Sequence, residues 1–400
     1  MENSVEARGP APPNLLLIAL AYIGFVSLGL PDSIIGVAWP SVRDRFGLHQ
    51  GTVGFLFAAS STGYFISSFL SGRLTRSLGI GVLLAASTGL VAASMFGFAF
   101  APAWLLFVGC GILHGLGSGA IDAGLNGYAA HSMSARHMNW LHACYCLGAM
   151  LGPLVMTGVL TGGRPYSVGY ALVGSVMGTL GLLFLATRPR WGTARASEDH
   201  PDGSFSSLAA LRHPDVLVSM VLFFLYTGLE VAFAQWTYTV LTESRGIAPS
   251  TAGVAVGFFW GALGSGRVLF GFLAESIGID RLLRVCLTAT VIGAILFAVP
   301  LGAAGAYAGL ALAGVGLAPV FPCLMTRTPQ RLGTQLSAHA IGFQVGSAMI
   351  GAAAVPGAMG WVAENIGLAR VPIGIVVVAC AVWLLHEVLV HRTRTEDLPS

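Results

Sequence analysis

Two polar side chains stand one helical turn apart inside a long apolar segment. Asp122 and Asn126 belong to the stretch GSGAIDAGLNGYAA, residues 117–130. In an α-helix, residues four positions apart lie on the same face. A buried carboxylate that gains and loses a proton can drive a coupled step, and an amide beside it can hold a polar molecule. The structural alternative is a carboxylate that only ties its helix to a neighbour.

Two further acids lie in apolar segments. Asp32 directly follows Pro31, which is expected to break its helix and expose polar backbone. Glu230 precedes Gln235 and Trp236 by one to two turns. A carboxylate, an amide and an indole form a usual set for hydrogen-bonding and stacking a sugar, although drug transporters use the same three groups. Each acid also has a structural interpretation. Asp32 would be a helix cap or a residue at the outer rim, and Glu230 would be a buried contact that ties the two halves together.

Several other polar residues in apolar segments are weaker candidates. His142 and Tyr145 lie about one turn apart, and Gln344 stands in a later segment. Tyr64 and Tyr226 are interpreted as packing aromatics. The residues predicted to bind a substrate are Asp32, Asp122, Asn126, His142, Tyr145, Glu230, Gln235, Trp236 and Gln344. Asp122 and Asp32 are also the residues predicted to carry protons, and His114 is interpreted as structural.

The composition places the chain among polytopic membrane proteins. Charged residues make up 9% of the chain, against about 25% in soluble proteins. The apolar runs are continuous rather than alternating, which predicts spanning helices and not a β-barrel. The 54 glycines agree with close helix packing in lipid. All six cysteines lie in apolar segments, which argues against disulfides and against a cysteine-based metal site.

No enzyme motif is present in the sequence. It contains no H-E-x-x-H, no G-x-S-x-G and no Walker A pattern, and it has no basic patch with interleaved aromatics. We therefore expect no enzymatic activity, no cofactor, no metal and no nucleic-acid partner.

Polar and proline-rich breaks divide the chain into twelve apolar runs of spanning length. The expected spans are 15–40, 51–72, 79–100, 103–130, 138–161, 167–187, 215–241, 250–271, 281–300, 303–326, 336–360 and 367–390. The longest polar stretch, 188–214, lies near the middle of the chain. The predicted organisation is a six-helix bundle over 1–187, a linker over 188–214 and a second six-helix bundle over 215–400.

Two patterns support this organisation. Arginines concentrate in the loops that would share a side with both termini, which predicts cytoplasmic termini and linker. The stretch LSGRLTRSLG at 70–79 also recurs as LFGFLAESIG at 269–278, half a chain later. Parallel six-helix repeats are the plan of one large class of transporters.

The six-plus-six spans, the central linker and the repeated G-x-L-x-x-x-x-G loop resemble the major facilitator superfamily. The family form carries an Asp five positions into the loop, followed by a basic residue. Here those positions hold Arg76 and Ser77 in the first half, and Glu275 and Ser276 in the second. The resemblance implies a cytoplasmic gate made of Gly72, Arg73, Arg76, Arg267, Gly271 and Glu275.

Within the superfamily, the chain resembles the fucose:proton symporter family and its sodium-dependent-glucose-transporter-like relatives. The stretches that carry this resemblance are GLPDSIIGVAWP (29–40), AIDAGLNGY (120–128), NWLHACYCLGAMLGP (139–153), LYTGLEVAFAQW (225–236) and GLAPVFPCLM (316–325). That family has an acid in span one, which Asp32 matches, and an acid with Asn four residues on in span four, which Asp122 and Asn126 match. A sugar-contacting Asn of span five is replaced by Tyr145.

The expectation is a monomeric secondary transporter, in a bacterial inner membrane, that imports a monosaccharide or related polyol with protons by alternating access. A proton-coupled exporter of drugs or metabolites on the same fold is the nearest alternative. A sugar uniporter is another, and a transport-dead receptor belongs to a different class.

Overall fold

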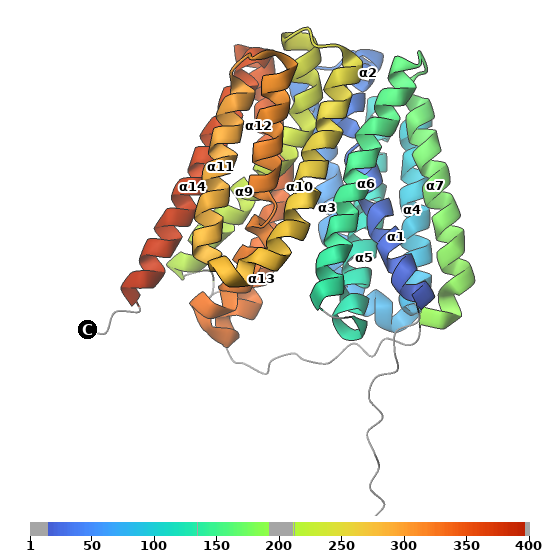
Figure 1. The fold of residues 1–400 in the computed structure, drawn as a ribbon. Helices are drawn as coiled ribbons and strands as arrows, with labels where there is room; N and C mark the ends of the chain where they lie inside the picture. Colours follow the sequence, from blue (N-terminus) through green and yellow to red (C-terminus); the bar gives the residue numbers. More distant parts are fainter. Residues whose placement is uncertain (1–14, 134, 192–210, 212, 397–400) are drawn as a thin grey trace, which may run out of the picture.

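The computed structural model of this protein describes residues 15–133, 135–191, 211 and 213–396, some of them, such as 138–139 and 274–275, by their backbone only. The described chain is almost entirely helical (Figure 1). The first helices are α1 (Leu15–Asp32), α2 (Ile35–Phe46), α3 (Val53–Leu78), α4 (Ile80–Phe100), α5 (Trp104–Ser132), α6 (Ala135–Thr161) and α7 (Tyr166–Thr187). The later ones are α9 (Pro214–Thr239), α10 (Pro249–Ile277), α11 (Ile279–Ala298), α12 (Gly302–Leu317), α13 (Val320–Val362) and α14 (Val371–Glu396).

Eleven described stretches are long and apolar enough to cross a membrane. The last of them, Ala340–Arg392, contains the end of α13 and most of α14. These two helices are separated at Gly367, whose φ of 120° is incompatible with a continuing helix. Counting them separately gives the twelve spans that the sequence predicts. The predicted all-helical fold is confirmed.

Helix α13 differs from the prediction, which separated spans ten and eleven by the loop 327–335. The backbone stays helical from Val320 to Val362. Yet the Thr328 hydroxyl donates to Gln344 Oε1 at 3.1 Å. Sixteen residues of straight helix would be about 24 Å long, so α13 must turn back on itself between these residues. One helix therefore contributes to two spans.

The first span is interrupted as Pro31 predicts. Helix α1 ends at Asp32 and α2 begins at Ile35. The Ser33 hydroxyl donates to the Gly29 carbonyl at 3.2 Å, so part of the freed backbone is satisfied locally. This break places the Asp32 carboxylate at a helix end within the span.

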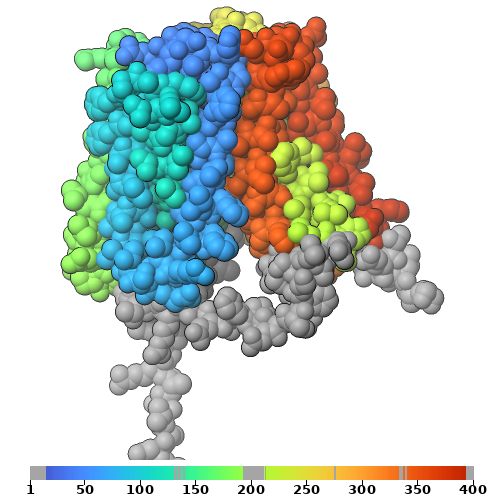
Figure 2. Space-filling view, turned by 180° about the vertical axis from the view of Figure 1, so that it is seen from behind, coloured from blue at the N-terminus to red at the C-terminus, as the bar shows by residue number. Residues whose placement is uncertain are grey.

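The helices form two groups, α1–α7 and α9–α14, which we call the first and second bundles (Figure 1). They pack together mainly through α6 against α10 and α3 against α13. The second of these contacts is seen from behind in Figure 2, where α3 and α13 lie side by side. The start of α1 and the C-terminal end lie at the same end of the bundles, which we call the terminal side; the opposite end is the far side. The predicted domain boundaries, which fall partly outside the described residues, stay predictions.

Polar contacts hold the two bundles together at the far side. Arg43 Nη1 donates to Glu243 Oε2 at 2.9 Å, and Gln50 Nε2 donates to the same oxygen at 3.0 Å. His49 Nδ1 lies 2.8 Å from Glu364 Oε1, and the Gln50 backbone N–H donates to Glu364 Oε2 at 2.9 Å. Each acid comes from the second bundle and each partner from the first.

Glycines let the backbones meet beside these ion pairs. A Cβ at Gly360 would lie 2.7 Å from the Gly51 Cα, closer than real Cβ atoms come. A Cβ at Gly54 would lie 3.3 Å from the Gly357 Cα. Side chains at these positions would push α3 and α13 apart at the far side.

The terminal side has no such connection among the described residues. The ion pairs recorded there between described residues lie within the second bundle. They are Asp280 with Arg327 and Arg331, Arg284 with Glu387, and Asp215 with Arg392. The protein is therefore closed at the far side, and its bundles separate toward the terminal side in Figure 1.

We predict that Glu243→Gln weakens the far-side closure. The substitution replaces the carboxylate that Arg43 and Gln50 both contact by an uncharged amide. Partly exposed ion pairs each stabilise a structure by roughly 0.2–1 kcal/mol. The far-side-open population should rise about two- to fivefold, measured as the long-distance fraction between spin labels on α2 and α9. Asp44→Asn is the matched control, because it removes only the Arg43 contact within the first bundle. Equal distance distributions in both variants would contradict the prediction.

Candidate functional site

The Asp122 carboxylate is held by two uncharged donors. The Tyr64 hydroxyl donates to Oδ2 at 2.6 Å, and Asn126 Nδ2 donates to Oδ1 at 3.0 Å. Tyr64 comes from α3, which packs tightly on α5: a Cβ at Gly119 would lie 2.5 Å from the Tyr64 carbonyl oxygen. A small residue on α5 thus brings the phenol within reach. Among the described residues, no cation forms an ion pair with Asp122.

The Asp32 carboxylate lies between two other helices. The Tyr145 hydroxyl of α6 donates to Oδ2 at 3.1 Å, and His114 Nε2 of α5 lies 3.2 Å from Oδ1. The Asp32 side chain is 26% exposed and that of His114 11%. Asp32 therefore differs from Asp122 in facing a group that can carry positive charge.

The Glu230 carboxylate lies in the second bundle. The Tyr226 hydroxyl, one turn earlier on α9, donates to Oε2 at 2.6 Å. Arg267 Nη2 of α10 lies 3.8 Å from the same oxygen, and both charged side chains are largely buried. This distance fits an ion pair rather than a direct hydrogen bond.

Each of the three acids thus accepts a hydrogen bond from a tyrosine hydroxyl. Tyr145 lies within electrostatic range of both Asp32 and Glu230, and Asp122 within range of Asp32. The three acids with their tyrosines, His114, Asn126 and Arg267 form what we call the central cluster. It draws on both bundles.

Arg267 lies elsewhere than the expected cytoplasmic gate. Its guanidinium is buried beside Glu230 and within electrostatic range of Cys146. Because α10 continues for more than two turns beyond it, Arg267 is removed from the terminal-side loop. A buried acid on α9 and the close packing of α6 on α10 account for this position.

The other expected gate residues lie at helix ends. Gly72, Arg73 and Arg76 are exposed near the end of α3, and Gly271 is exposed on α10. No ion pair of Arg73 or Arg76 occurs among the described residues. The side chain of Glu275 lies outside the described residues. The gate stays a prediction.

Gln235 and Trp236 are not contacts of Glu230. The Trp236 indole is fully buried and donates to the Pro356 carbonyl at 3.0 Å, tying α9 to α13. Gln235 is 2% exposed, and neither of its amide atoms has a hydrogen-bond partner in the described part of the chain. His142 packs its ring edge-on against Phe25 at 5.4 Å.

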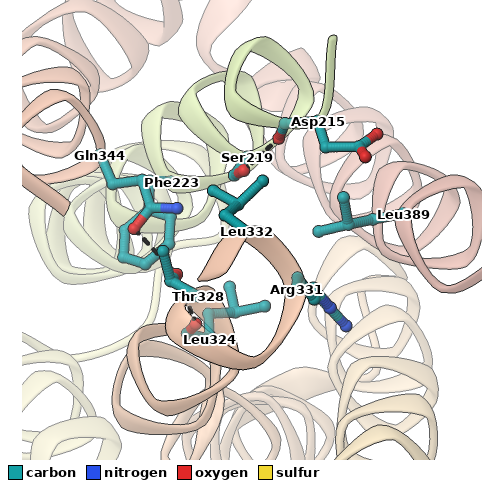
Figure 3. A pocket seen from close by; sticks show the side chains of 9 residues that line it. All are labelled: Asp215, Ser219, Phe223, Leu324, Thr328, Arg331, Leu332, Gln344 and Leu389. Carbon is teal, nitrogen blue, oxygen red and sulfur yellow. Dashed lines mark hydrogen bonds between the residues drawn. The ribbon is translucent and has the colours of Figure 1, made fainter. Parts of the chain in front are cut away.

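Gln344 lies in a separate cavity inside the second bundle (Figure 3). The cavity holds about 10 Å³, room for roughly one water molecule. Its walls come from α9, α13 and α14. The lining residues are Asp215, Ser219, Phe223, Leu324, Thr328, Arg331, Leu332, Gln344 and Leu389. The structure therefore does not bring Gln344 into the central cluster.

The sequence interpretation missed four residues near the acids. Tyr226 could have been found, because it precedes Glu230 by four residues on one helix face. His114 precedes Asp122 by two turns, which is a weaker signal. For Tyr64 and Trp260, no pattern in the nearby sequence indicates that they lie near an acid. The Trp260 ring lies 6.1 Å from that of Tyr145, and its buried indole N–H has no partner among the described residues.

Comparison with known proteins agrees with this architecture. The model of the Major Facilitator Superfamily matches residues 21–356. The chain belongs to the Major Facilitator Superfamily. It is thus an integral, multi-pass membrane transporter and not an enzyme, as predicted.

The relatives include sugar transporters. The glucose/mannose transporter GlcP of Bacillus subtilis is 23% identical over 94% of this chain and 95% of its own length. The human sodium-dependent glucose transporter 1 is 23% identical over 63% of this chain and 55% of its own. The crystal structure of a mutant of the nucleoside transporter NupG matches with a TM-score of 0.79 at 13% identity, covering 94% of this chain and all of that one. The last match shows the fold alone.

We predict that Glu230→Gln destabilises the protein strongly, because Arg267 would keep its buried charge without its acid. Breaking a buried pair costs about 3–5 kcal/mol, whereas breaking an exposed one costs less than about 1 kcal/mol. Thermal unfolding in detergent should show a clearly lower Tm for Glu230→Gln than for Glu387→Gln, whose partner Arg284 is more exposed. The double variant Glu230→Gln/Arg267→Gln should recover much of the loss. Equal Tm values for the two single variants would show that other groups compensate Arg267.

Proposed function

We propose that this transporter imports a small polar solute, a monosaccharide or related polyol, together with protons. The observation that carries the proposal is the central cluster, where three carboxylates from the two bundles each meet a tyrosine hydroxyl. The glucose transporters among its relatives favour a sugar as the solute. The protein is proposed to act as a monomer.

The chemistry of the cluster suits an uncharged polyhydroxy compound. Carboxylates and phenols offer hydrogen-bond acceptors and donors close together. The buried Trp260 beside Tyr145 adds an apolar ring face and an indole N–H that has no partner in the described part of the chain. Gln235 stays a proposed substrate contact outside the cluster, with an amide that has no partner among the described residues. Asp32, Asp122, Asn126, Tyr145 and Glu230 stay the proposed substrate contacts. The arrangement favours packing roles for His142 and Trp236, and Gln344 lies in a separate cavity.

Asp122 is the proposed proton-coupling residue. The Asp122 carboxylate is half-buried and has no counter-charge among the described residues, which is costly in a membrane. Protonation removes that cost. Its described partners, Tyr64 and Asn126, are neutral. They do not cancel the charge of the carboxylate, so a proton must do so. Neutralising it lowers the free-energy barrier to moving the two bundles between alternating states.

The direction of transport follows from the proposed orientation. Arginine-rich loops on the side of the termini favour a cytoplasmic terminal side, so the far side would face the outside of a bacterial inner membrane. The closure at the far side then corresponds to an inward-facing state.

Solute counterflow in proteoliposomes tests the proposal. Wild-type protein should exchange labelled glucose or another labelled monosaccharide saturably, and should concentrate it under an inward proton gradient. Asp122→Asn should keep exchange but lose at least about tenfold of the gradient-driven accumulation. Glu387→Gln is the matched acid-to-amide control, since Glu387 pairs with Arg284 away from the cluster.

Three other outcomes would change the proposal. Exchange that ignores both proton and sodium gradients would indicate a uniporter, and accumulation driven by sodium alone would replace the proton. No exchange of any sugar by folded protein would rule out the sugar substrate. Efflux of hydrophobic cations would then favour the exporter alternative.

A further inference from the structure

The His114–Asp32 pair distinguishes the two acids of the first bundle. Asp32 meets an imidazole at 3.2 Å, whereas Asp122 meets only a phenol and an amide among the described residues. His114 lies on α5 with Ser118 and Asp122, each one turn apart. The Ser118 hydroxyl lies 3.5 Å from His114 Nε2, the atom that faces Asp32.

The pair also lies at a different depth from Asp122. Helix α5 begins at the far side with Trp104 and runs toward the terminal side. At 1.5 Å per residue, His114 lies about 15 Å from that start and Asp122 about 27 Å. The pair is therefore two helical turns nearer to the far side, which is the side held closed in this structure.

We propose that His114 and Asp32 form a second protonation site, which loads from the far side and is separate from Asp122. This inference rests on the proposed proton coupling. In the loading step, His114 Nε2 accepts a proton and the pair becomes an imidazolium next to a carboxylate. The proton can then pass to Asp32: the Nε2–H bond breaks and an Oδ1–H bond forms. The products are a neutral imidazole and a carboxylic acid.

This arrangement keeps the loaded pair neutral wherever its proton resides. Before loading, the pair carries one negative charge; after loading it carries none, which favours its enclosure in the membrane. Among the described residues, the titratable and charged groups that face the pair come from three helices. Tyr145 of α6 donates to Asp32, Tyr64 of α3 acts on Asp32 at longer range, and Asp122 of α5 also lies within electrostatic range of Asp32. Helix α4 presents only the ring of Phe98, at 6.3 Å from that of His114.

The substitution His114→Gln tests the proposal. The amide of Gln can still donate to Asp32 but cannot carry the proton. Labelled-glucose uptake into cells producing the full chain is measured against the external pH, which is the far-side pH in the proposed orientation. In wild type, the His114 imidazole supplies an additional nitrogen acceptor for the incoming proton. Without it, Asp32 must take the proton alone, so the pH of half-maximal uptake should fall by at least about one unit.

His386→Gln is the matched control. His386 is also buried beside an acid, Glu387, but it lies in the second bundle and belongs to neither proposed proton site. Its pH profile should follow wild type. If His114→Gln does not fold, His114→Asn is the second variant. If neither folds, ¹⁵N-histidine spectra of the native protein should show that the His114 imidazole gains a proton as the pH is lowered.

The failure of this inference can be told from the failure of the proposed function. Wild-type uptake that depends on pH, with Asp122→Asn defective and His114→Gln unchanged in its midpoint, would make His114 a structural tie and overturn the second site only. A His114 imidazole signal that does not change as the pH is lowered would do the same. Uptake by wild type that ignores the proton gradient would overturn both proposals.

Discussion

An acid inside a membrane must find hydrogen-bond donors within the protein, and the core of this transporter is arranged around that requirement. Asp122 takes its phenol from α3, Asp32 takes one from α6, and Glu230 takes one from its own helix and an arginine from α10. Each acid therefore fixes how closely particular helices approach. Small residues such as Gly119 make that approach sterically possible.

Sequence periodicity predicts what lies on one helix but not what another helix brings to it. The pairing of Asp122 with Asn126, and the break after Pro31, follow from local geometry and were predictable. Tyr64 and Tyr145 could not be assigned, because they stand 58 and 113 residues from the acids they contact. Trp236 was expected beside Glu230, yet its indole N–H is directed to α13 instead. Arg267 was expected to belong to the cytoplasmic gate, and it lies in the core beside Glu230.

Charged residues at the terminal side are ion-paired in the second bundle but exposed in the first. In the second bundle, Asp280 joins two arginines of α13, and Asp215 joins α9 to α14. Such crosslinks favour movement of that bundle as one body. In the first bundle, Arg73 and Arg76 stay exposed and form no ion pair among the described residues. The first bundle thus offers free positive charge on the side where the bundles separate.

The glycine contacts at the far side bear on the speed of opening. Gly51 and Gly54 face Gly360 and Gly357 with backbone against backbone. Where side chains interlock, separation requires rotamers to change and packed volume to be re-formed. Where these glycines meet, the two backbones can move past each other or separate without such rotamer changes. The exposed ion pairs beside the glycines would still have to break, and because salt screens exposed charges, higher ionic strength would ease opening at this contact.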